Sequence, residues 1–253
     1  SNRPFRTIMR RLGSDISVSE LVSAKGIVYG GKKTLHLIRI SDQERPVGIQ
    51  LFGEDIPSLC EAAKIVEQNG ADFIDLNFGC PVVKVVRRGA GAGWLKRETE
   101  FGSLLEQVVK SVKIPVSIKI RTGWDGDSRN AIRMCEIAES SGIVWVAIHG
   151  RTRAQAYKGF ADWDYLNEVV QNVKIPIIGN GDILTKSDLL KRDQTFLGRG
   201  LMIGRGVLHD PLLCSSLENV SYAQIFKEYA ELILADFDER TSLPLLKRMA
   251  AWH

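Results

Sequence analysis

The segment Phe73-Ile74-Asp75-Leu76-Asn77-Phe78-Gly79-Cys80-Pro81 is a short apolar run that ends in a glycine, a cysteine and a proline. Its length and composition predict a strand over residues 73–78 that is buried on both faces, as in a parallel sheet. A basic, glycine-rich loop follows as far as Gly93. Because proline restrains the residue before it to extended geometry, we expect Cys80 to lie at a fixed corner where the strand ends.

Six further apolar runs alternate with helical segments along the chain. They cover residues 18–22, 46–52, 116–120, 145–148, 175–178 and 201–203. Amphipathic helices are expected between them, for example over 57–68, 101–112, 129–140 and 163–173. An open doubly wound sheet usually has five or six strands, whereas a TIM barrel has eight strands in about 250 residues. The seven repeats therefore predict an α/β chain that folds as a TIM (β/α)8 barrel.

The two ends of the chain refine this prediction. Ser1 and Asn2 before Pro4 resemble a capped helix start, so we expect the chain to begin at the first helix, with the first strand of the barrel missing. From Ser221 onward the pattern is helical only. We predict a barrel domain over residues 1–220 and the truncated beginning of a helical domain over residues 221–253.

The helical segment after Ser221 is expected to contain two helices. One covers residues 223–237, and the second covers 243–252 after a break at 241–244, where Pro244 lies. A proline inside a helix removes one backbone hydrogen bond and clashes with the preceding turn. We therefore expect the second helix to begin at Leu243.

Composition limits the class of protein. The net charge of +4 is mildly basic, which permits a polyanionic partner without requiring one. The four cysteines form no C-x-x-C pair and no spacing with histidines that is typical of zinc, so we predict no metal site and reduced thiols in a cytoplasm. No apolar run reaches the roughly 18 residues that a membrane helix requires, so no membrane association is expected.

Glycine-rich turns follow the last two predicted strands. Gly179-Asn180-Gly181-Asp182 follows the run at 175–178, and Gly204-Arg205-Gly206 follows the run at 201–203. Glycines let backbone amides approach phosphate oxygens, and Arg205 can add charge-assisted hydrogen bonds. One such turn is as often structural as functional. Two of them after strands seven and eight, where TIM barrels often bind phosphate, favour a phosphate site.

Other polar residues lie at the ends of the predicted strands. Gln50 offers a donor and an acceptor for the edge of a heterocycle, while Lys119 and His149 can stabilise an anionic ring. Each residue alone is equally well explained by a solvated loop or an internal hydrogen bond. Together with the phosphate turns, this set, which also includes Asn77 and Arg121, describes a site for flavin mononucleotide (FMN).

Cys80 has two interpretations at this stage. Cysteine is often a small buried apolar residue, which is our interpretation of Cys60, Cys135 and Cys214. For Cys80, inert packing competes with catalysis, and its position on the polar ring favours catalysis. Since no histidine adjoins it in sequence to activate a thiolate, a thiol that donates a proton is the better hypothesis.

Basic residues gather in three groups that we expect near the mouth of the barrel. A solvated charged face is the alternative explanation for each group. Basic residues with aromatic neighbours around a pocket suit an RNA whose base enters it. The groups are Arg3, Arg6 and Arg10; Lys84, Arg87, Arg88, Lys96 and Arg97; and Arg151, Arg153, Tyr157 and Lys158.

These residues resemble the tRNA-dihydrouridine synthase family across nearly the whole barrel. The Asn-x-Gly-Cys-Pro block at Asn77 is the most specific part, and the phosphate turns are shared with many barrels. The matching segments are Arg3–Arg6, Glu20–Lys25, Gly48–Gly53, Asn77–Gly93, Lys119–Trp124, Ile148–Arg153, Gly179–Asp182 and Met202–Gly206.

The resemblance implies a flavoenzyme that uses NADPH to reduce uridines of tRNA to dihydrouridine. Hydride would pass from reduced flavin N5 to C6 of the uracil while Cys80 protonates C5. By position, the residues that would hold FMN are Gln50, Lys119, His149, Asn180, Gly181, Asp182, Gly204 and Arg205. Those that would contact the substrate are Asn77, Arg121, Arg151, Arg153, Tyr157, Lys84, Arg87 and Arg88. The helices after residue 220 would begin a tRNA-binding domain, and we expect a monomer.

Two other functions remain open on the sequence. An FMN barrel that acts on a small molecule, such as a dihydroorotate or ene reductase, would share the phosphate turns without needing the basic groups. A non-catalytic RNA-binding barrel would keep the basic groups and bind no flavin.

Overall fold

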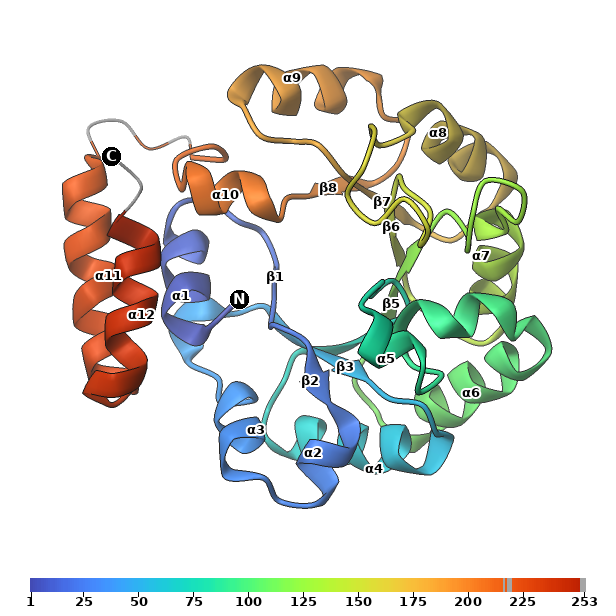
Figure 1. The fold of residues 1–253 in the computed structure, drawn as a ribbon, viewed down its shortest axis with the longest axis horizontal. Coiled ribbons are helices and arrows are strands. Elements are labelled where there is room, and N and C mark those ends of the chain that lie inside the picture. Colours follow the sequence, from blue (N-terminus) through green and yellow to red (C-terminus); the bar gives the residue numbers. More distant parts are fainter. Residues whose placement is uncertain (216, 218–219, 251–253) are drawn as a thin grey trace.

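The structure, a computed structural model, describes residues 1–215, 217 and 220–250 of the 253-residue chain. Its centre is a parallel sheet with the strand order β1-β3-β4-β5-β6-β7-β8, in which β2 also pairs with β3. The strands surround a common axis, and most helices lie outside them (Figure 1). The strands are β1 (Ser17–Val18), β2 (Val22–Ser23), β3 (Val47–Phe52), β4 (Phe73–Asn77), β5 (Val116–Arg121), β6 (Val146–His149), β7 (Ile177–Asn180) and β8 (Gly200–Met202).

The helices follow the strands in the alternation that the sequence predicts. They are α1 (Arg3–Arg11), α2 (Ala24–Val28), α3 (Lys32–Leu37), α4 (Ile56–Gln68), α5 (Val83–Val86), α6 (Glu98–Ser111), α7 (Ala131–Ser140), α8 (Trp163–Asn172), α9 (Lys186–Thr195), α10 (Arg205–His209), α11 (Tyr222–Asp236) and α12 (Glu239–Met249), with short 3-10 turns at Asp42–Glu44 and Gly91–Lys96. The α/β barrel prediction is confirmed. Among the described residues β1 and β8 do not pair with each other, and the expected additional strand before Ser1 stays a prediction.

The predicted strand over 18–22 is two short strands, and the reason lies in Ser19. The Ser19 hydroxyl oxygen accepts the backbone N–H of Gln50 at 2.8 Å, in place of a backbone carbonyl. The backbone ladder with β3 is therefore interrupted between β1 and β2, although both strands pair in parallel with β3. Two two-residue strands separated by residues 19–21 were not visible in the hydrophobic pattern.

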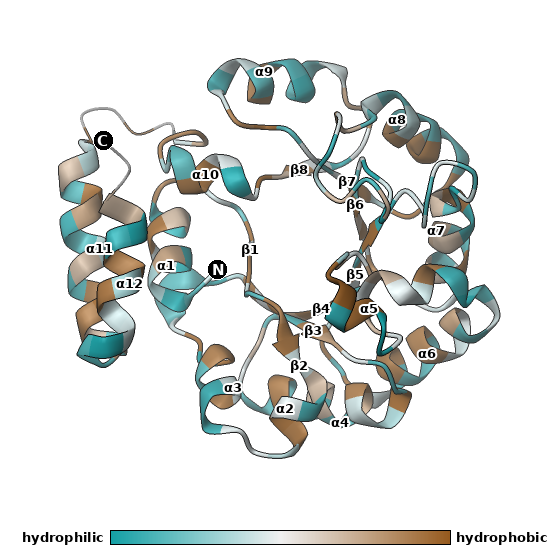
Figure 2. Ribbon diagram, in the orientation of Figure 1, coloured by the Kyte–Doolittle hydropathy of each residue, from teal (hydrophilic) through white to brown (hydrophobic). Residues whose placement is uncertain are grey.

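The core lies between the strands and the inner faces of the helices. Figure 2 shows apolar strands at the centre and polar positions on the outer sides of the surrounding helices. Helices begin at side-chain caps that satisfy their first N–H groups. Asp55 accepts the N–H of Ser58 at the start of α4, and Asp162 accepts the N–H of Tyr165 at the start of α8, each at 2.9 Å.

Helix α1 begins where the sequence predicts, but its arginines do not form an exposed basic face. Asn2 caps the helix by accepting the N–H of Phe5 at 2.9 Å. Arg6 is 1% exposed, and its Nε lies 2.5 Å from Glu44 Oε2. The prediction that Arg6 faces RNA is therefore wrong, because this face of α1 packs inward against the turn at residues 42–44.

The two other arginines of this group are also used inside the chain. Arg3 forms an ion pair with Asp236 of α11, and Arg10 donates to the carbonyl of Arg45 at 2.7 Å. In Figure 1, α11 and α12 lie beside α1 as a helical pair. Arg3 thus connects α1 to the C-terminal helices, whereas Arg10 joins α1 to the segment before β3.

The break in the C-terminal helical segment lies earlier than predicted. Helix α12 begins at Glu239, because Asp238 accepts the N–H of Thr241 at 2.8 Å and caps it. The helix continues through Pro244, which removes only one hydrogen bond, while Met249 is buried. The predicted end at Trp252 lies outside the described residues, and the domain boundary at 220/221 stays a prediction. None of the described helices has the length and apolarity needed to cross a membrane.

Candidate active site

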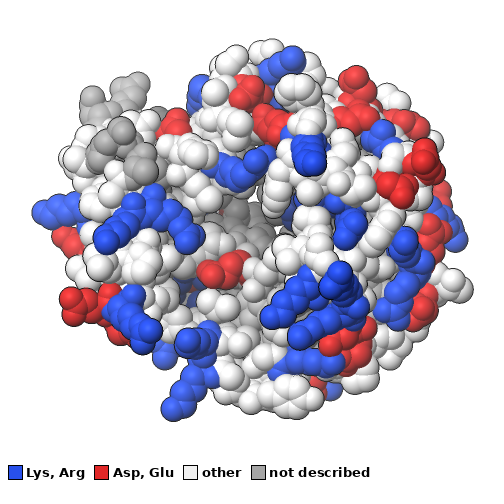
Figure 3. Space-filling model, viewed as in Figure 1, with Lys and Arg blue, Asp and Glu red and all other residues white. Residues whose placement is uncertain are grey.

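A cavity of about 320 Å³ opens where strands β4 to β8 end. Most of its lining residues end these strands or directly follow them, as expected for the carboxyl ends of a barrel sheet. In Figure 3 the molecular face is hollowed at its centre, and lysine and arginine side chains gather on several sides of the hollow. The lining residues are Leu21, Asn77, Gly79, Cys80, Pro81, Val82, Lys119, Ile120, Arg121, His149, Tyr157, Asn180, Gly181, Asp182, Ile183, Leu184, Met202, Ile203, Gly204 and Arg205.

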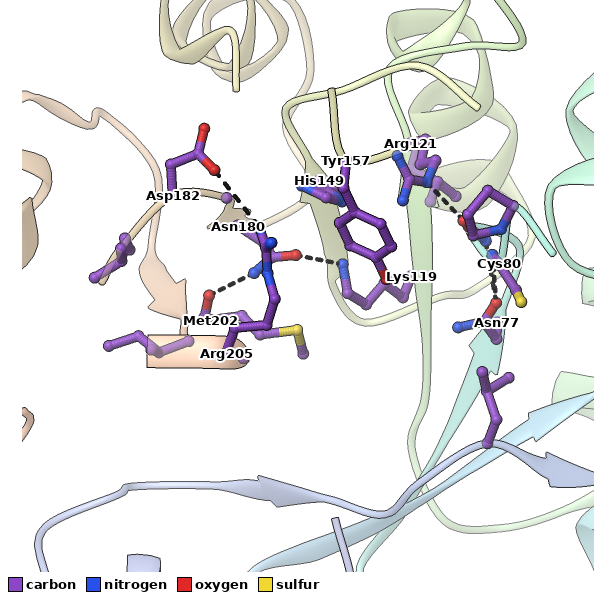
Figure 4. Close-up of a pocket in the computed structure, with 18 of the residues that line it drawn as sticks. Asn77, Cys80, Lys119, Arg121, His149, Tyr157, Asn180, Asp182, Met202 and Arg205 are labelled. Carbon is purple, nitrogen blue, oxygen red and sulfur yellow. Dashed lines mark hydrogen bonds and ion pairs between the residues drawn. The ribbon is translucent and has the colours of Figure 1, made fainter. Parts of the chain in front are cut away.

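Lys119 places a half-buried ammonium group in this cavity. Its Nζ donates to Asn180 Oδ1 at 2.8 Å, and Asn180 Nδ2 in turn donates to the carbonyl of Met202 at 2.7 Å (Figure 4). Burial lowers the pKa of Lys119 from 10.5 to about 8. The cavity therefore holds a cation below this pH, with a neutral amide as its hydrogen-bonded partner.

His149 is a neutral imidazole with an assignable tautomer. Its Nε2 lies 3.3 Å from Arg151 Nη1, and a guanidinium can only donate. Nε2 must therefore accept, and Nδ1 carries the proton. Burial, followed by the positive charges of Lys119 and nearby arginines, lowers the pKa of His149 far below its ordinary value. His149 thus lines the cavity as a neutral imidazole whose proton is on Nδ1.

The two glycine-rich turns lie together on the opposite side of the cavity from Cys80 (Figure 4). The backbone N–H groups of Gly181, Asp182, Gly204 and Arg205 have no acceptor among the described residues. The Arg205 side chain is half exposed, and its Nη2 lies 3.7 Å from Asp182 Oδ1. Four unpaired backbone donors beside a guanidinium suit a phosphate group.

Space is also available beside these turns. A Cβ atom added at Gly204 would meet no atom within 4 Å. Gly181 has a φ of +133°, and a Cβ there would lie 2.6 Å from the Cβ of Ala161. Gly181 is therefore required by close packing, whereas Gly204 leaves open space where a phosphate can approach the backbone. The residues present fit the phosphate end of FMN.

Cys80 lines the cavity and is 7% exposed. Its backbone N–H donates to Asn77 Oδ1 at 2.9 Å, and its carbonyl accepts the N–H of Ala92 at 3.1 Å. Both bonds fix the corner after β4. In the part of the chain that the structure describes, the thiol has no hydrogen-bond partner. This geometry agrees with a positioned thiol without an adjacent base.

Gln50 does not line the cavity and lies one step behind it. Its Nε2 donates to Asp75 Oδ2 at 2.5 Å, and its Oε1 accepts from Asn77 Nδ2 at 3.0 Å. The side chain is 7% exposed. Gln50 thus contacts the cavity wall through Asn77, and its direct contact with a flavin stays a prediction.

The arginines predicted to touch substrate differ in position. Arg121 lines the cavity but is 2% exposed, and its guanidinium donates to the carbonyls of Gly79, Thr152 and Ala156 at 2.7 to 3.0 Å. Burial lowers its pKa to about 10. Arg151 is 3% exposed and does not line the cavity.

Arg151 connects the loop after β6 to the turn after β7. It donates to the carbonyls of Lys158 and Gly159 and to Asp182 Oδ2, at 3.2, 2.6 and 2.8 Å. Because these donors are used within the chain, Arg151 orients His149 and joins the β6 loop to the β7 turn. A direct contact with RNA does not fit its burial, so this prediction is corrected.

Basic and aromatic residues lie on the loops at the rim of the cavity, and two of them, Tyr157 and Arg205, also line it. Lys84, Arg87 and Arg88 are exposed on and after α5. The Arg153 guanidinium lies 4.4 Å from the ring centre of Trp124. Tyr157 is 59% exposed, and the Arg205 guanidinium lies 4.8 Å from its ring centre. These positions agree with their predicted place at the rim.

Comparison with known proteins identifies the family. Residues 1–239 match the sequence model of the dihydrouridine synthase family. The chain belongs to this family. It is 35% identical over 98% of its length to a probable tRNA-dihydrouridine synthase of Rickettsia conorii, of which it covers 80%. It is 36% identical over its whole length to tRNA-dihydrouridine synthase B of Pseudomonas putida, of which it covers 73%.

Solved structures agree with the barrel fold. Histamine dehydrogenase from Rhizobium sp. 4-9 superposes with a TM-score of 0.63 at 14% identity, over 88% of this chain and 44% of that one. A 2-naphthoyl-CoA reductase superposes with a TM-score of 0.60 at 14% identity, over 83% of this chain and 45% of that one. At this identity the likeness supports the fold alone.

For this dihydrouridine synthase family member, most of the predicted cofactor residues converge on one cavity. Lys119, His149, Asn180, the β7 turn and the β8 turn all line it, and Cys80 with Asn77 lies across from them. Within the described residues, no cluster of three or more His, Cys, Asp or Glu side chains is arranged to hold a metal.

Sequence reasoning missed the carboxylate behind the cavity and the apolar wall. Asp75 is fully buried in β4, and Ser117 of β5 donates to it. The signal was present, because Asp75 is the single acid in an otherwise apolar run. Leu21, Met202 and Ile203 contribute apolar surface to the cavity, and nothing distinguished them from ordinary core residues.

Proposed function

We propose that this chain reduces uridines in tRNA to 5,6-dihydrouridine, with FMN as its cofactor. The observation that supports this best is one cavity that combines a half-buried cation, an imidazole, two turns with unpaired backbone N–H groups and a positioned thiol. Family membership and the names of the relatives agree with this reaction.

FMN would be held from the side of β5 to β8. The β7 turn at Asn180, Gly181 and Asp182 and the β8 turn at Gly204 and Arg205 would bind the phosphate. Lys119 and His149 would face the ring system, where an ammonium group and a neutral N–H donor stabilise negative charge that develops on reduction. Asp182 would act through its backbone, because its carboxylate already accepts from Arg151 and from the N–H of Ala161 at 2.7 Å.

Bound FMN, reduced by NADPH, would supply the hydride that goes to C6 of the uracil. The remaining chemistry is a proton transfer from this chain. Cys80 would give its thiol proton to C5 and regain one from solvent. Its position across the cavity from the phosphate turns (Figure 4) lets a flat ring lie between the two sides. Asn77 would orient the uracil through the N–H that its bond to Gln50 leaves free.

The rim residues would bind the RNA that carries the base. A uridine inside folded tRNA must leave its stack to enter an active-site cavity. Lys84, Arg87, Arg88, Arg153 and Tyr157 are placed to contact phosphates and bases around the opening. A monomer in the cytoplasm remains our expectation for the whole protein.

The function is tested with purified protein, FMN and NADPH on tRNA from cells that lack dihydrouridine synthases. Dihydrouridine should accumulate only when all three components are present, as measured by mass spectrometry of the digested tRNA. Flavin that binds but is oxidised only by a small enone or dihydroorotate would favour the small-molecule reductase. Tight tRNA binding by a protein that takes up no flavin would favour the non-catalytic barrel.

A further inference from the structure

Behind the cavity, three neighbouring strands place polar side chains opposite one another. Gln50 of β3 is the register partner of Asp75 of β4, and Asp75 is the register partner of Ser117 of β5. These side chains are 7%, 1% and 0% exposed. In a sheet whose strands are otherwise apolar, a buried row of this kind must satisfy its own hydrogen bonds.

The row continues as one chain of hydrogen bonds to Cys80. Ser117 Oγ donates to Asp75 Oδ1 at 2.8 Å, and Gln50 Nε2 donates to Asp75 Oδ2 at 2.5 Å. Gln50 Oε1 then accepts from Asn77 Nδ2 at 3.0 Å. Finally, Asn77 Oδ1 accepts the backbone N–H groups of Gly79 and Cys80 at 3.2 and 2.9 Å.

The carboxylate of Asp75 determines which group donates and which accepts in each hydrogen bond of this network. An amide side chain has a donor end and an acceptor end, whereas an ionised carboxylate only accepts. Burial raises the pKa of Asp75, against the smaller opposing effects of the donors Gln50 and Ser117 and the charge of Lys119, and both oxygens of Asp75 accept hydrogen bonds in the structure. An acceptor at position 75 turns the NH2 group of Gln50 toward it and the oxygen of Gln50 toward Asn77.

The orientation of Asn77 follows from that of Gln50. Because the NH2 group of Asn77 donates to Gln50, its oxygen faces the turn after β4 and holds two backbone N–H groups there. If Asn77 were reversed, its NH2 group would face two further donors, and neither bond could form. One N–H of Asn77 stays free, and Asn77 lines the cavity.

We propose that Asp75 is a positioning residue, which orients the amides of Gln50 and Asn77 and thereby holds the turn that carries Cys80. A second consequence is that Asn77 presents a donor to the cavity, so the ring bound there must present an acceptor such as a carbonyl oxygen. The effect on catalysis rests on the proposed function of Cys80. The effect on the turn does not, and it is measurable without cofactor.

The experiment measures alkylation of Cys80 by iodoacetamide in protein without added flavin, by mass spectrometry of the peptides. Cys135 is completely buried and reports global opening in the same sample, so the ratio of the two rates isolates the turn. The variants are Asp75→Leu, which removes the acceptor, and Asp75→Asn, which keeps one acceptor oxygen. Gln50→Leu and the double variant Asp75→Leu/Gln50→Leu complete a cycle.

Loss of the acceptor should raise the Cys80 to Cys135 rate ratio about tenfold, as expected for one lost buried hydrogen bond. Asp75→Asn should leave the ratio near that of the wild type. Gln50→Leu should raise the rate ratio as much as Asp75→Leu does. The double variant should show the same increase as each single variant, and not the product of the two increases, because both residues act in one hydrogen-bond network.

Three results would overturn the proposal. They are an unchanged ratio in Asp75→Leu, an equal increase in Asp75→Asn, and a double variant whose increase is the product of the single effects. If Asp75→Leu does not fold, Gln50→Leu carries the test, because Asp75 then keeps its bond to Ser117 and only the connection to Asn77 is lost. If the ratios behave as expected but the wild-type protein forms no dihydrouridine, the proposed function fails while the positioning role of Asp75 holds.

Discussion

Lys119 Nζ lies 2.8 Å from Asn180 Oδ1, and this hydrogen bond joins β5 to β7 at the cavity wall. The two residues lie two strands apart in the sheet, with β6 between them. An ammonium group that is buried against a neutral amide keeps its charge only at the cost of desolvation. Because the pKa of Lys119 is about 8, the loss of its charge can be followed by a series of measurements at different pH values.

The first prediction concerns FMN affinity as a function of pH. Below about pH 8 Lys119 is charged and can attract an anionic ligand, whereas above this pH the charge is lost. The affinity for FMN, measured by quenching of flavin fluorescence, should therefore fall as the pH rises through about 8. Lys119→Met should bind FMN more weakly at pH 7 and lack this step. A wild-type affinity that is flat between pH 7 and pH 9 would contradict the assignment.

Stability should change in the opposite direction for the same reason. The pKa of Lys119 is lower in the folded state than the unfolded value of 10.5, so the unfolded state binds more protons between about pH 8 and 10.5. The destabilisation is complete below about pH 8 and is relieved as the pH rises through this window. In urea unfolding of the ligand-free protein, Lys119→Met should lack the gain that wild type shows from pH 8 to pH 10.

Cys80→Ala should separate flavin chemistry from product formation. The variant loses a small, 7% exposed thiol whose backbone bonds are kept. It should bind FMN, accept electrons from NADPH and lose dihydrouridine formation by a factor of about 100 or more, as expected for loss of a general acid. Cys214→Ala, a half-buried cysteine outside the cavity, is the matched control. Normal tRNA modification by Cys80→Ala would remove the thiol from the mechanism.

Gly204→Ala should weaken FMN binding without weakening the fold. A Cβ at this position meets no atom of the chain within 4 Å, yet Gly204 lines the cavity beside Arg205. The added methyl group would occupy the space through which a phosphate approaches the backbone, so we expect about a tenfold loss of affinity. Gly126→Ala also adds a Cβ in open space, but outside the cavity. Equal FMN affinity of the two variants would contradict a phosphate site at the β8 turn.

The sequence predicts this site well where one segment determines the geometry. The strand over 73–78 and the corner at Cys80 follow from an apolar run and a proline, and both were found. The contacts of Gln50 were harder to predict, because its partner Asp75 lies on the next strand and their pairing depends on the sheet register. Arg6 shows the same limit, since helical periodicity defines a face of α1 but not which element covers it. Glu44 lies 38 residues away along the chain.

The exposed basic residues of α5 should determine affinity for tRNA. Replacing Lys84, Arg87 and Arg88 by glutamine should weaken tRNA binding and reduce the slope of log affinity against log salt by about 2, as expected for the loss of three phosphate contacts. The matched control replaces Lys64, Lys110 and Arg133, which are exposed on the outer helices α4, α6 and α7. Equal slopes for the two triple variants would show that the α5 residues form an ordinary solvated face.

Arg6 should contribute to stability and not to RNA binding. Its guanidinium and the Glu44 carboxylate are 1% and 0% exposed, so removing one partner leaves a buried charge unpaired. Arg6→Met should lower the free energy of unfolding by about 3–5 kcal/mol, and Arg6→Met/Glu44→Leu should recover part of this loss. Urea unfolding measures both values. The folded fraction of Arg6→Met should bind tRNA with the wild-type salt slope, since Arg6 makes no contact with solvent. A slope reduced by about 1 would instead assign Arg6 to a phosphate.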